Sequence, residues 1–118
     1  MATSDGRRPE RVAEMVLREL SQMLLRDLKD PRLRGTTITS VKMTDDLRHG
    51  RVLFSHLEGH ERAPEVIRGF KSAEGFIRRS IGRALSLRYT PEFDFEFDEG
   101  PERAARVDAL LREERSRT

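Results

Sequence analysis

The sequence predicts a single α+β domain in which helices cover one face of a three-stranded sheet. Apolar residues recur every three or four positions over residues 9–29 and 64–87, which is typical of amphipathic helices. β-Branched residues dominate 36–43, Val52 and Phe54 would share one face of a strand over 51–57, and phenylalanine alternates with acidic residues over 93–98. A chain of 118 residues is long enough for one such domain.

The first predicted helix covers about residues 9–29. Pro9 suits the first helical position, and the acidic Glu10 suits the positive end of the helix. Asp30-Pro31 ends the helix, because the residue before a proline is pushed out of the α region. Residues 1–7 are expected to be disordered. The apolar stripe of this helix consists of Val12, Val16, Leu20, Leu24 and Leu28.

Two strands follow, at residues 36–43 and 51–57. The intervening segment 44–50 has the composition of a turn, so the two strands are expected to form an antiparallel hairpin. Residues 58–62 are polar and are expected to form a loop.

The segment 64–87 has two faces. A single helix of this length would extend roughly 36 Å, which is about twice an average helix. Ser72 can cap a new helix, and Gly75 weakens a continuous one. We therefore predict two helices, 64–72 and 75–87, joined by a kink. The apolar stripe contains Val66, Phe70, Ala73, Ile77, Ile81 and Ala84. The opposite, basic stripe contains Arg68, Lys71, Gly75, Arg78 and Gly82, with Arg79 and Arg83 beside it.

Phe93, Phe95 and Phe97 predict a last strand with its aromatic face inward and its acidic face in solvent. A short helix is expected over 101–114. The predicted organisation is a disordered segment 1–7, a folded domain 8–100, and a C-terminal helix and tail 101–118.

Composition narrows the function. The sequence contains no cysteine, which excludes disulfides and thiolate metal sites. It shows no apolar run long enough to span a membrane and no apolar signal core, so we expect a cytoplasmic protein without a membrane partner. Residues 66–88 carry six Lys and Arg against one acid, whereas 89–103 carry six acids against one Arg. This separation predicts a directional electrostatic field.

Six local strings occur in order along the chain: Arg11-Val12-Ala13-Glu14, Lys29-Asp30-Pro31-Arg32-Leu33, Asp46-Leu47-Arg48-His49, Ala73-Glu74-Gly75-Phe76-Ile77-Arg78, Leu87-Arg88-Tyr89-Thr90-Pro91-Glu92 and Arg106-Val107-Asp108-Ala109-Leu110-Leu111. These strings resemble bacterial ribosome-binding factor A, and the order of elements resembles a type II KH domain. One departure is Gly100-Pro101, which stands where many members carry a serine and an apolar residue.

The resemblance implies a ribosome biogenesis factor. Ala73 and Gly75 would form an Ala-x-Gly kink in place of the usual KH Gly-x-x-Gly loop. The factor would bind free 30S subunits near the 5′-terminal helix of 16S rRNA, assist late 30S maturation and 16S rRNA processing, and support growth in the cold. Ribosomal proteins or other assembly factors are further candidate partners, and the protein is expected to be a monomer.

The kink is the candidate RNA site. A helix N-terminus presents unpaired N–H groups, and nearby cations would add contacts to the sugar-phosphate backbone. The predicted RNA-binding residues are Arg68, Lys71, Ser72, Ala73, Gly75, Arg78, Arg79 and Arg83. Secondary candidates are Arg7, Arg8, Arg11, Arg34 and Arg48. The phenylalanines, Phe76 included, have core periodicity and Tyr89 is read as a structural anchor, so binding by shape and phosphate contact is expected in place of base stacking.

Two other functions remain open. Asp94, Glu96 and Asp98 could hold Mg²⁺ in an RNA-cleaving enzyme, or the chain could be a protein-interaction module, for example one that docks a basic ribosomal protein on these acids. The simpler interpretation of the acids is a solvated strand face. His49, His56 and His60 lie in different predicted elements and do not suggest a metal site. No catalytic residue, metal or cofactor is expected.

Overall fold

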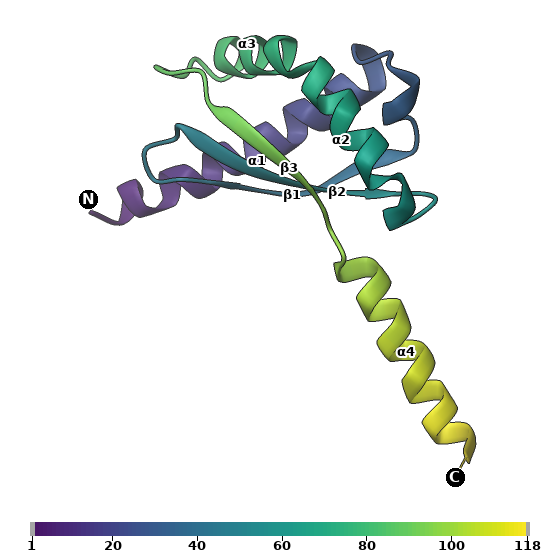
Figure 1. Cartoon of the computed structure of the whole chain (residues 1–118). Coiled ribbons are helices and arrows are strands. Elements are labelled where there is room, and N and C mark those ends of the chain that lie inside the picture. Colours follow the sequence, from purple (N-terminus) through teal and green to yellow (C-terminus); the bar gives the residue numbers. More distant parts are fainter. Residues whose placement is uncertain (1, 118) are drawn as a thin grey trace.

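The computed structural model describes residues 2–117, with side chains for residues 8–116, and shows the predicted α+β class (Figure 1). Its arrangement is that of a type II KH-like domain. The elements in chain order are α1 (Ala2–Arg26), the 3₁₀ turn η1 (Pro31–Leu33), β1 (Thr36–Met43), β2 (His49–His56), the 3₁₀ turn η2 (His60–Arg62), α2 (Ala63–Ser72), α3 (Glu74–Ala84), β3 (Glu92–Phe97) and α4 (Gly100–Arg117).

The sheet is mixed, with the strand order β1-β2-β3. The predicted hairpin is confirmed, since β1 and β2 pair antiparallel, whereas β2 and β3 pair parallel. A parallel pair needs a long crossover, and α2 and α3 provide it. The register of β1 shifts between Ile38 and Ser40. This bulge at Thr39 brings Val41 and Met43 to the same face as Ile38. In a regular strand they would lie on the opposite face from Ile38, because each is an odd number of residues away from it.

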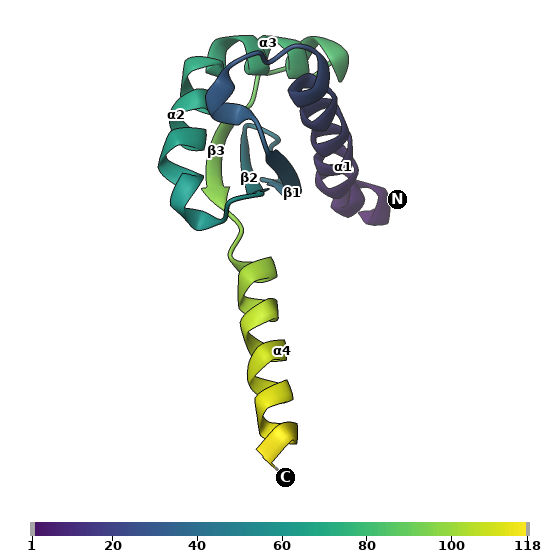
Figure 2. The same ribbon diagram turned by 90° about the vertical axis from the view of Figure 1, so that its right-hand side faces the viewer.

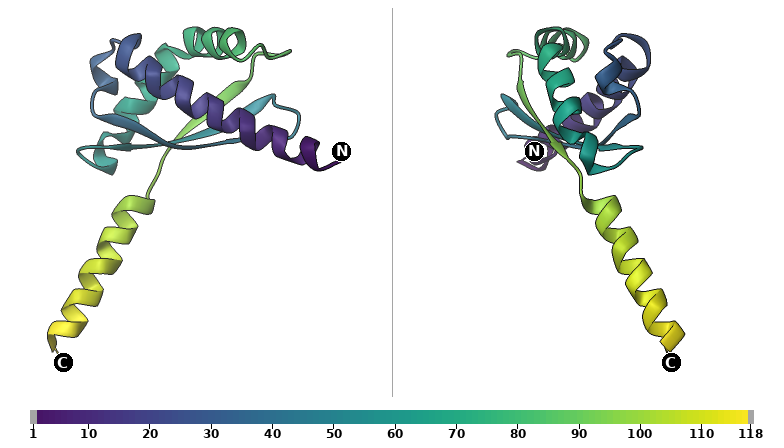
Figure 3. Two further views of the ribbon diagram at one scale, coloured as in Figure 1. Left: turned by 180° about the vertical axis from the view of Figure 1, so that it is seen from behind. Right: turned by 45° about the vertical axis from the view of Figure 1, so that its right-hand side comes forward.

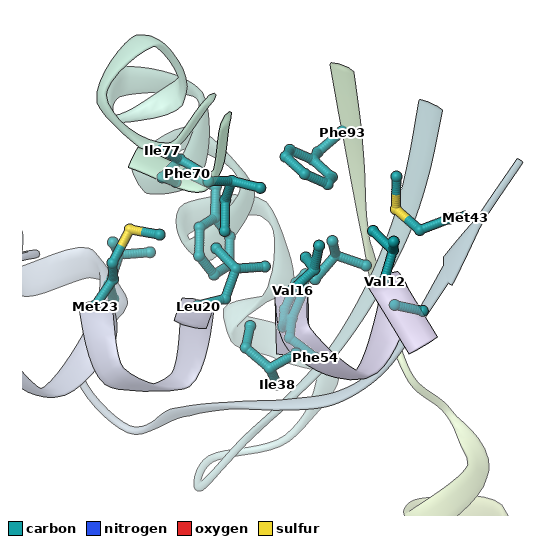
Figure 4. Packing of buried hydrophobic residues seen from close by; sticks show 14 of the residues in the cluster. Val12, Val16, Leu20, Met23, Ile38, Met43, Phe54, Phe70, Ile77 and Phe93 are labelled. Carbon is teal, nitrogen blue, oxygen red and sulfur yellow. The ribbon is translucent and has the colours of Figure 1, made fainter. Parts of the chain in front are cut away.

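The core lies between one face of the sheet and three helices (Figure 2), with α1 on the right, α2 on the left and α3 across the top. Seen from behind in Figure 3, α1 lies across the strands. Val16 and Leu20 of α1 are fully buried beside Phe54 of β2 (Figure 4). Phe70 of α2 and Phe95 of β3 stack with 4.2 Å between their ring centroids. The predicted inward aromatic face of β3 is therefore confirmed.

The kink between α2 and α3 is present, and it is centred on Ala73, whose φ and ψ are −95° and 3°. The second helix ends at Ala84, earlier than the expected residue 87. Ser86 adopts a left-handed conformation with φ of 52°. The Leu87 N–H donates to the Gly82 carbonyl at 3.0 Å, which completes a Schellman-type end. Ala84 is exposed and does not belong to the core stripe.

The first helix differs from its predicted range at both ends. It begins at Ala2, so the backbone of residues 2–7 is helical where the sequence predicts disorder, and Pro9 lies inside the helix. Pro9 removes only one backbone hydrogen bond and holds φ at a helical value, so the helix can continue through it. The helix ends at Arg26 in place of residue 29, because the N–H groups of Asp27 and Leu28 both donate to the Met23 carbonyl.

The last helix, α4, projects away from the domain (Figure 1) and is longer than the predicted 101–114. The Asp98 carboxylate accepts the Gly100 N–H at 2.9 Å and so caps the helix start. Pro101 fits in the first turn, where a missing N–H costs nothing. Gly100-Pro101 is thus compatible with a helix. The boundary between the domain and its tail at residue 100 stays a prediction.

Candidate nucleic-acid interface

Ala73 joins the two helices at the kink. Its N–H donates to the carbonyls of Gly69 and Phe70, at 3.2 and 3.1 Å, and so closes α2. Its carbonyl accepts the Ile77 N–H at 2.9 Å and so opens α3. The side chain is half-buried against the core. The start of α3, with its N–H groups, therefore lies in the middle of the chain and at the domain surface.

Gly75 lies in the first turn of α3 and is exposed. Its backbone is helical, and the glycines with positive φ are elsewhere, at Gly35 and Gly59. A Cβ atom built on Gly75 would lie 3.2 Å from the Arg79 Nη1, so the Arg79 guanidinium lies beside the bare backbone. The kink therefore does not require a glycine at position 75. A glycine there would instead allow a ligand to approach the backbone closely.

Four predicted cations around the kink are exposed, and they make no hydrogen bond or ion pair with the described residues. Two lie on α2 and two on α3, and they are Arg68, Lys71, Arg79 and Arg83. Unpaired guanidinium and ammonium groups keep their full donor capacity for an anionic partner.

Arg78 has a different environment, although the sequence places it on the same stripe. Its side chain is half-buried, and its Nε donates to the Pro91 carbonyl at 2.9 Å. Its Nη2 donates to the Thr90 carbonyl at 3.2 Å. These bonds tie α3 to the segment that leads into β3. Arg78 therefore stabilises the fold, and its charge is partly screened from a ligand.

Ser72 does not cap α3 as predicted, because the cap residue is Ala73 and no side chain caps this helix. The Ser72 hydroxyl instead accepts a hydrogen bond from Arg32 Nη2 at 3.0 Å. Arg32 also pairs with Asp30, at 2.6 Å between Nη2 and Oδ2, and its hydrogen bonds hold the pKa of Asp30 below the usual range. Sequence reasoning missed Arg32 as a neighbour of the kink, although it lies in one of the family-like strings.

Phe76 is 43% exposed, so the prediction that it belongs to the core is wrong. The buried residues of α3 are Ile77 and Ile81. A helix rotates by about 100° per residue, and Phe76 is therefore turned away from the stripe that these isoleucines define. An exposed aromatic ring at the kink is a feature that the periodicity did not predict.

The secondary candidates are not gathered at the kink. The side chain of Arg7 lies outside the described residues, and Arg8 and Arg11 are exposed on α1. Arg34 is exposed in the loop before β1. Arg48 lies in the hairpin turn, with its guanidinium carbon 4.1 Å from the centroid of the Tyr89 ring. Tyr89 is 45% exposed and is held by this cation–π contact.

Two of the three candidate metal-binding acids, Glu96 and Asp98, are occupied by contacts within the protein, whereas Asp94 is exposed. Arg51 binds Glu96 through two hydrogen bonds of 2.7 and 2.9 Å, which lower the pKa of Glu96. Asp98 accepts from the Thr39 hydroxyl at 2.7 Å, which lowers the pKa of Asp98. Among the side chains of residues 8–116, which the structure describes, no group of three or more His, Asp and Glu is arranged to hold a metal ion. These contacts do not favour the metal-dependent enzyme.

The three histidines occupy separate contacts. His49 lies 3.3 Å from Glu92, and His60 lies 3.2 Å from Glu102. His56 contacts the Arg34 carbonyl through Nε2 at 2.7 Å. None of the helices in the described part of the chain is long and apolar enough to cross a membrane.

Comparison with known proteins identifies the family. The family model described as ribosome-binding factor A matches residues 8–111. Ribosome-binding factor A of Acetivibrio thermocellus is 46% identical over 107 residues, which cover 90% of this chain and 87% of the relative. The relative from Geobacter sulfurreducens is 40% identical over 106 residues and covers 90% of each chain.

Solved structures of the same family have this fold. The solution structure of a Thermotoga maritima protein, a putative ribosome binding factor A, is 31% identical with a TM-score of 0.59 and covers 71% of this chain and 84% of its own. The crystal structure of ribosome-binding factor A from Thermus thermophilus has a TM-score of 0.65 at 22% identity and covers 75% of this chain and 93% of its own. A Thermus thermophilus homology model fitted into a map of a 30S complex has a TM-score of 0.60 at 23% identity, with 74% and 91% coverage. The chain therefore belongs to the ribosome-binding factor A family.

Proposed function

We propose that this protein is a non-enzymatic ribosome assembly factor that binds RNA in the free 30S subunit. The observation that carries the proposal is the set of four exposed, unpaired cations around the break between α2 and α3. Family membership supports the partner, since the Thermus thermophilus relative is fitted into a map of a 30S complex. By binding one rRNA conformation in preference to others, the factor would shift the rRNA toward that conformation.

The electrostatic field supports the same face. The segment 66–88 has a surplus of five positive charges. The acids Asp94 and Glu96 lie on a different element, β3, whose Phe95 packs against Phe70 of α2. If the four free cations each neutralise one phosphate, log K should fall with log salt at a slope of about −3 to −4. A flat salt dependence would contradict an RNA interface.

The decisive variant reverses three charges, with Lys71→Glu, Arg79→Glu and Arg83→Glu in one chain. We expect it to keep the fold, because these side chains are exposed, and to lose binding to free 30S subunits in sedimentation assays. Arg78 is left unchanged, since its bonds to Pro91 and Thr90 make its replacement a test of stability.

A matched control carries Arg106→Glu and Arg112→Glu on the projecting α4. Both residues are exposed. The control therefore makes two charge reversals, against three in the kink variant, while the kink remains intact. The proposal expects the control to sediment with 30S subunits. Binding that survives in the kink variant and disappears in the control would place the interface on α4.

The finer proposal concerns the place and the process. We propose that the protein acts in the cytoplasm as a monomer, near the 5′-terminal helix of 16S rRNA, in late 30S maturation and 16S rRNA processing. Other assembly factors or ribosomal proteins would be additional partners. Chemical probing of 16S rRNA with and without the protein tests the position, and accumulation of unprocessed 16S rRNA at low temperature in a deletion strain tests the process.

A further inference from the structure

We infer that Phe76 is a stacking platform for one unpaired base of the bound RNA. The inference deepens the proposed function and rests on it. The binding site would then recognise a single-stranded or flipped-out nucleotide at the kink, in addition to phosphates.

Phe76 differs from the other phenylalanines of the chain. Each of the others is buried or half-buried and contacts another aromatic ring, and they are Phe54, Phe70, Phe93, Phe95 and Phe97. Phe76 is 43% exposed and has no aromatic partner among the described residues. Its ring contributes little to the core and has free surface for a ligand.

A depression of about 250 Å³ lies beside the ring. Its apolar lining includes Phe76, Leu28, Leu33 and Ala73, and its polar lining includes Asp27 and Lys29. A single exposed apolar side chain is ordinary on a protein surface, but here the ring forms one wall of a hollow with an apolar lining and a few polar groups. An apolar lining with a few polar groups is typical of small-ligand sites, and the flat face of Phe76 suits a planar group.

Charge decides which part of a nucleotide fits. Asp27 and Asp30 line the depression together with Lys29, and Asp30 is already paired with Arg32. Two carboxylates against one ammonium group leave no surplus of positive charge for a phosphate inside the depression. A base is uncharged, has apolar faces, and carries N–H groups that carboxylates can accept. The phosphates on either side would instead meet the free cations Lys71 and Arg79, which do not line the depression.

The order of residues along α3 fits this arrangement. Gly75 presents bare backbone, Phe76 follows it directly, and Arg79 lies one turn further on the same side as Phe76. A sugar-phosphate chain that passes over Gly75 would bring its base to Phe76. Stacking on an aromatic ring tolerates any base, so this contact adds affinity without strict sequence preference.

The test uses the absence of tryptophan from the sequence. In Phe76→Trp the new indole is the single tryptophan, and stacking with a base should quench its fluorescence. The probe is a single-stranded oligoribonucleotide of about 12 nucleotides, compared with a duplex of the same sequence and with an abasic version. Leu57→Trp, at a side chain that is 89% exposed before η2, is the matched control.

We expect the single strand to quench the indole of the Phe76→Trp variant, and the duplex and the abasic RNA to quench it little. The indole of the Leu57→Trp control should not be quenched by any of the three. Phe76→Leu, which keeps an apolar side chain without a ring, should weaken single-strand binding roughly 5- to 150-fold and leave the melting temperature unchanged. Phe76→Trp should retain single-strand binding, because it keeps an aromatic ring.

Two results would overturn the inference. If the oligonucleotide binds with the expected salt dependence but Phe76→Leu binds equally well and the indole of Phe76→Trp is not quenched, the phosphate interface stands and the stacking platform is wrong. If that indole responds to whole 30S subunits but neither to the oligoribonucleotide nor to free 16S rRNA, a protein side chain covers the ring in place of a base. If the unmodified protein binds no RNA at all, the proposed function itself is refuted.

Discussion

Replacement of Gly75 by alanine separates the two roles that a glycine at the kink could have. The backbone of Gly75 is helical, so alanine is compatible with its conformation. Alanine is favoured over glycine in a helix by about 1 kcal/mol. The added Cβ would meet only the flexible end of Arg79, 3.2 Å away. We therefore expect the free energy of unfolding to rise by about 0.5–1 kcal/mol, which corresponds to a melting temperature about 2–5 °C higher.

The affinity for RNA should fall in the same Gly75→Ala variant, although its stability rises. If a phosphate approaches the N–H groups at the start of α3, a methyl group on residue 75 would displace it. Loss of one hydrogen bond to a charged group costs about 1.5–3 kcal/mol, which is roughly 10- to 150-fold in affinity. Thermal unfolding and fluorescence anisotropy with a labelled oligoribonucleotide measure the two effects on the same protein sample.

Gly82→Ala is the control, because Gly82 lies in the same helix but faces Thr90. Its Cβ would lie 3.3 Å from the Thr90 Oγ1, which a small shift of Thr90 relieves. We expect a similar helix gain and unchanged RNA binding. Wild-type affinity in Gly75→Ala would refute close approach at Gly75, and marked destabilisation of that variant would refute the assignment of the kink to Ala73.

Three further predictions concern the scaffold. Gly69→Ala should lower the free energy of unfolding by about 1–3 kcal/mol in urea titrations, because its Cβ would lie 2.8 Å from Leu33 Cδ2; no loss would mean that η1 moves freely on α2. The hydrogen bond from Thr39 lowers the pKa of Asp98, so the stability from this carboxylate is present above its unfolded pKa of about 3.9 and disappears as the pH falls through the lower folded value. Urea titrations between neutral pH and a pH of about 3 should show this loss, and Asp98→Asn should reduce it. Removal of the chain from Gly100 onward should leave the melting temperature nearly unchanged, because the α4 side chains are almost all exposed, and a large decrease would show that α4 supports the domain.

The elements of the fold follow from local patterns in the sequence. The Thr36–Met43 strand and the alternating phenylalanines of β3 are recognisable because side-chain direction in a strand repeats every two residues. The kink was predictable from length and from the pair Ser72 and Gly75, although it is centred on the residue Ala73 between them. The ends of α1 and α3 were less predictable, since they depend on which carbonyl each terminal N–H reaches.

The bulge at Thr39 was not predictable from periodicity. Without it, Ile38 and Met43 would lie on opposite faces of β1, yet both are buried in the same core. The partner of Thr39 is Asp98, fifty-nine residues away in the chain. An interaction at this distance along the sequence has no local signature.

The basic composition of the kink region was determined by the sequence alone, as was the choice of Lys71, Arg79 and Arg83 as candidate contacts. Which of its residues are free to bind was decided only by tertiary structure. Arg78 is tied to Pro91, and Phe76 is exposed. Helical periodicity assigns a residue to a direction around the helix axis, whereas availability to a ligand depends on which distant segment packs there. The sequence therefore locates the candidate interface, and the fold selects the side chains that can act in it.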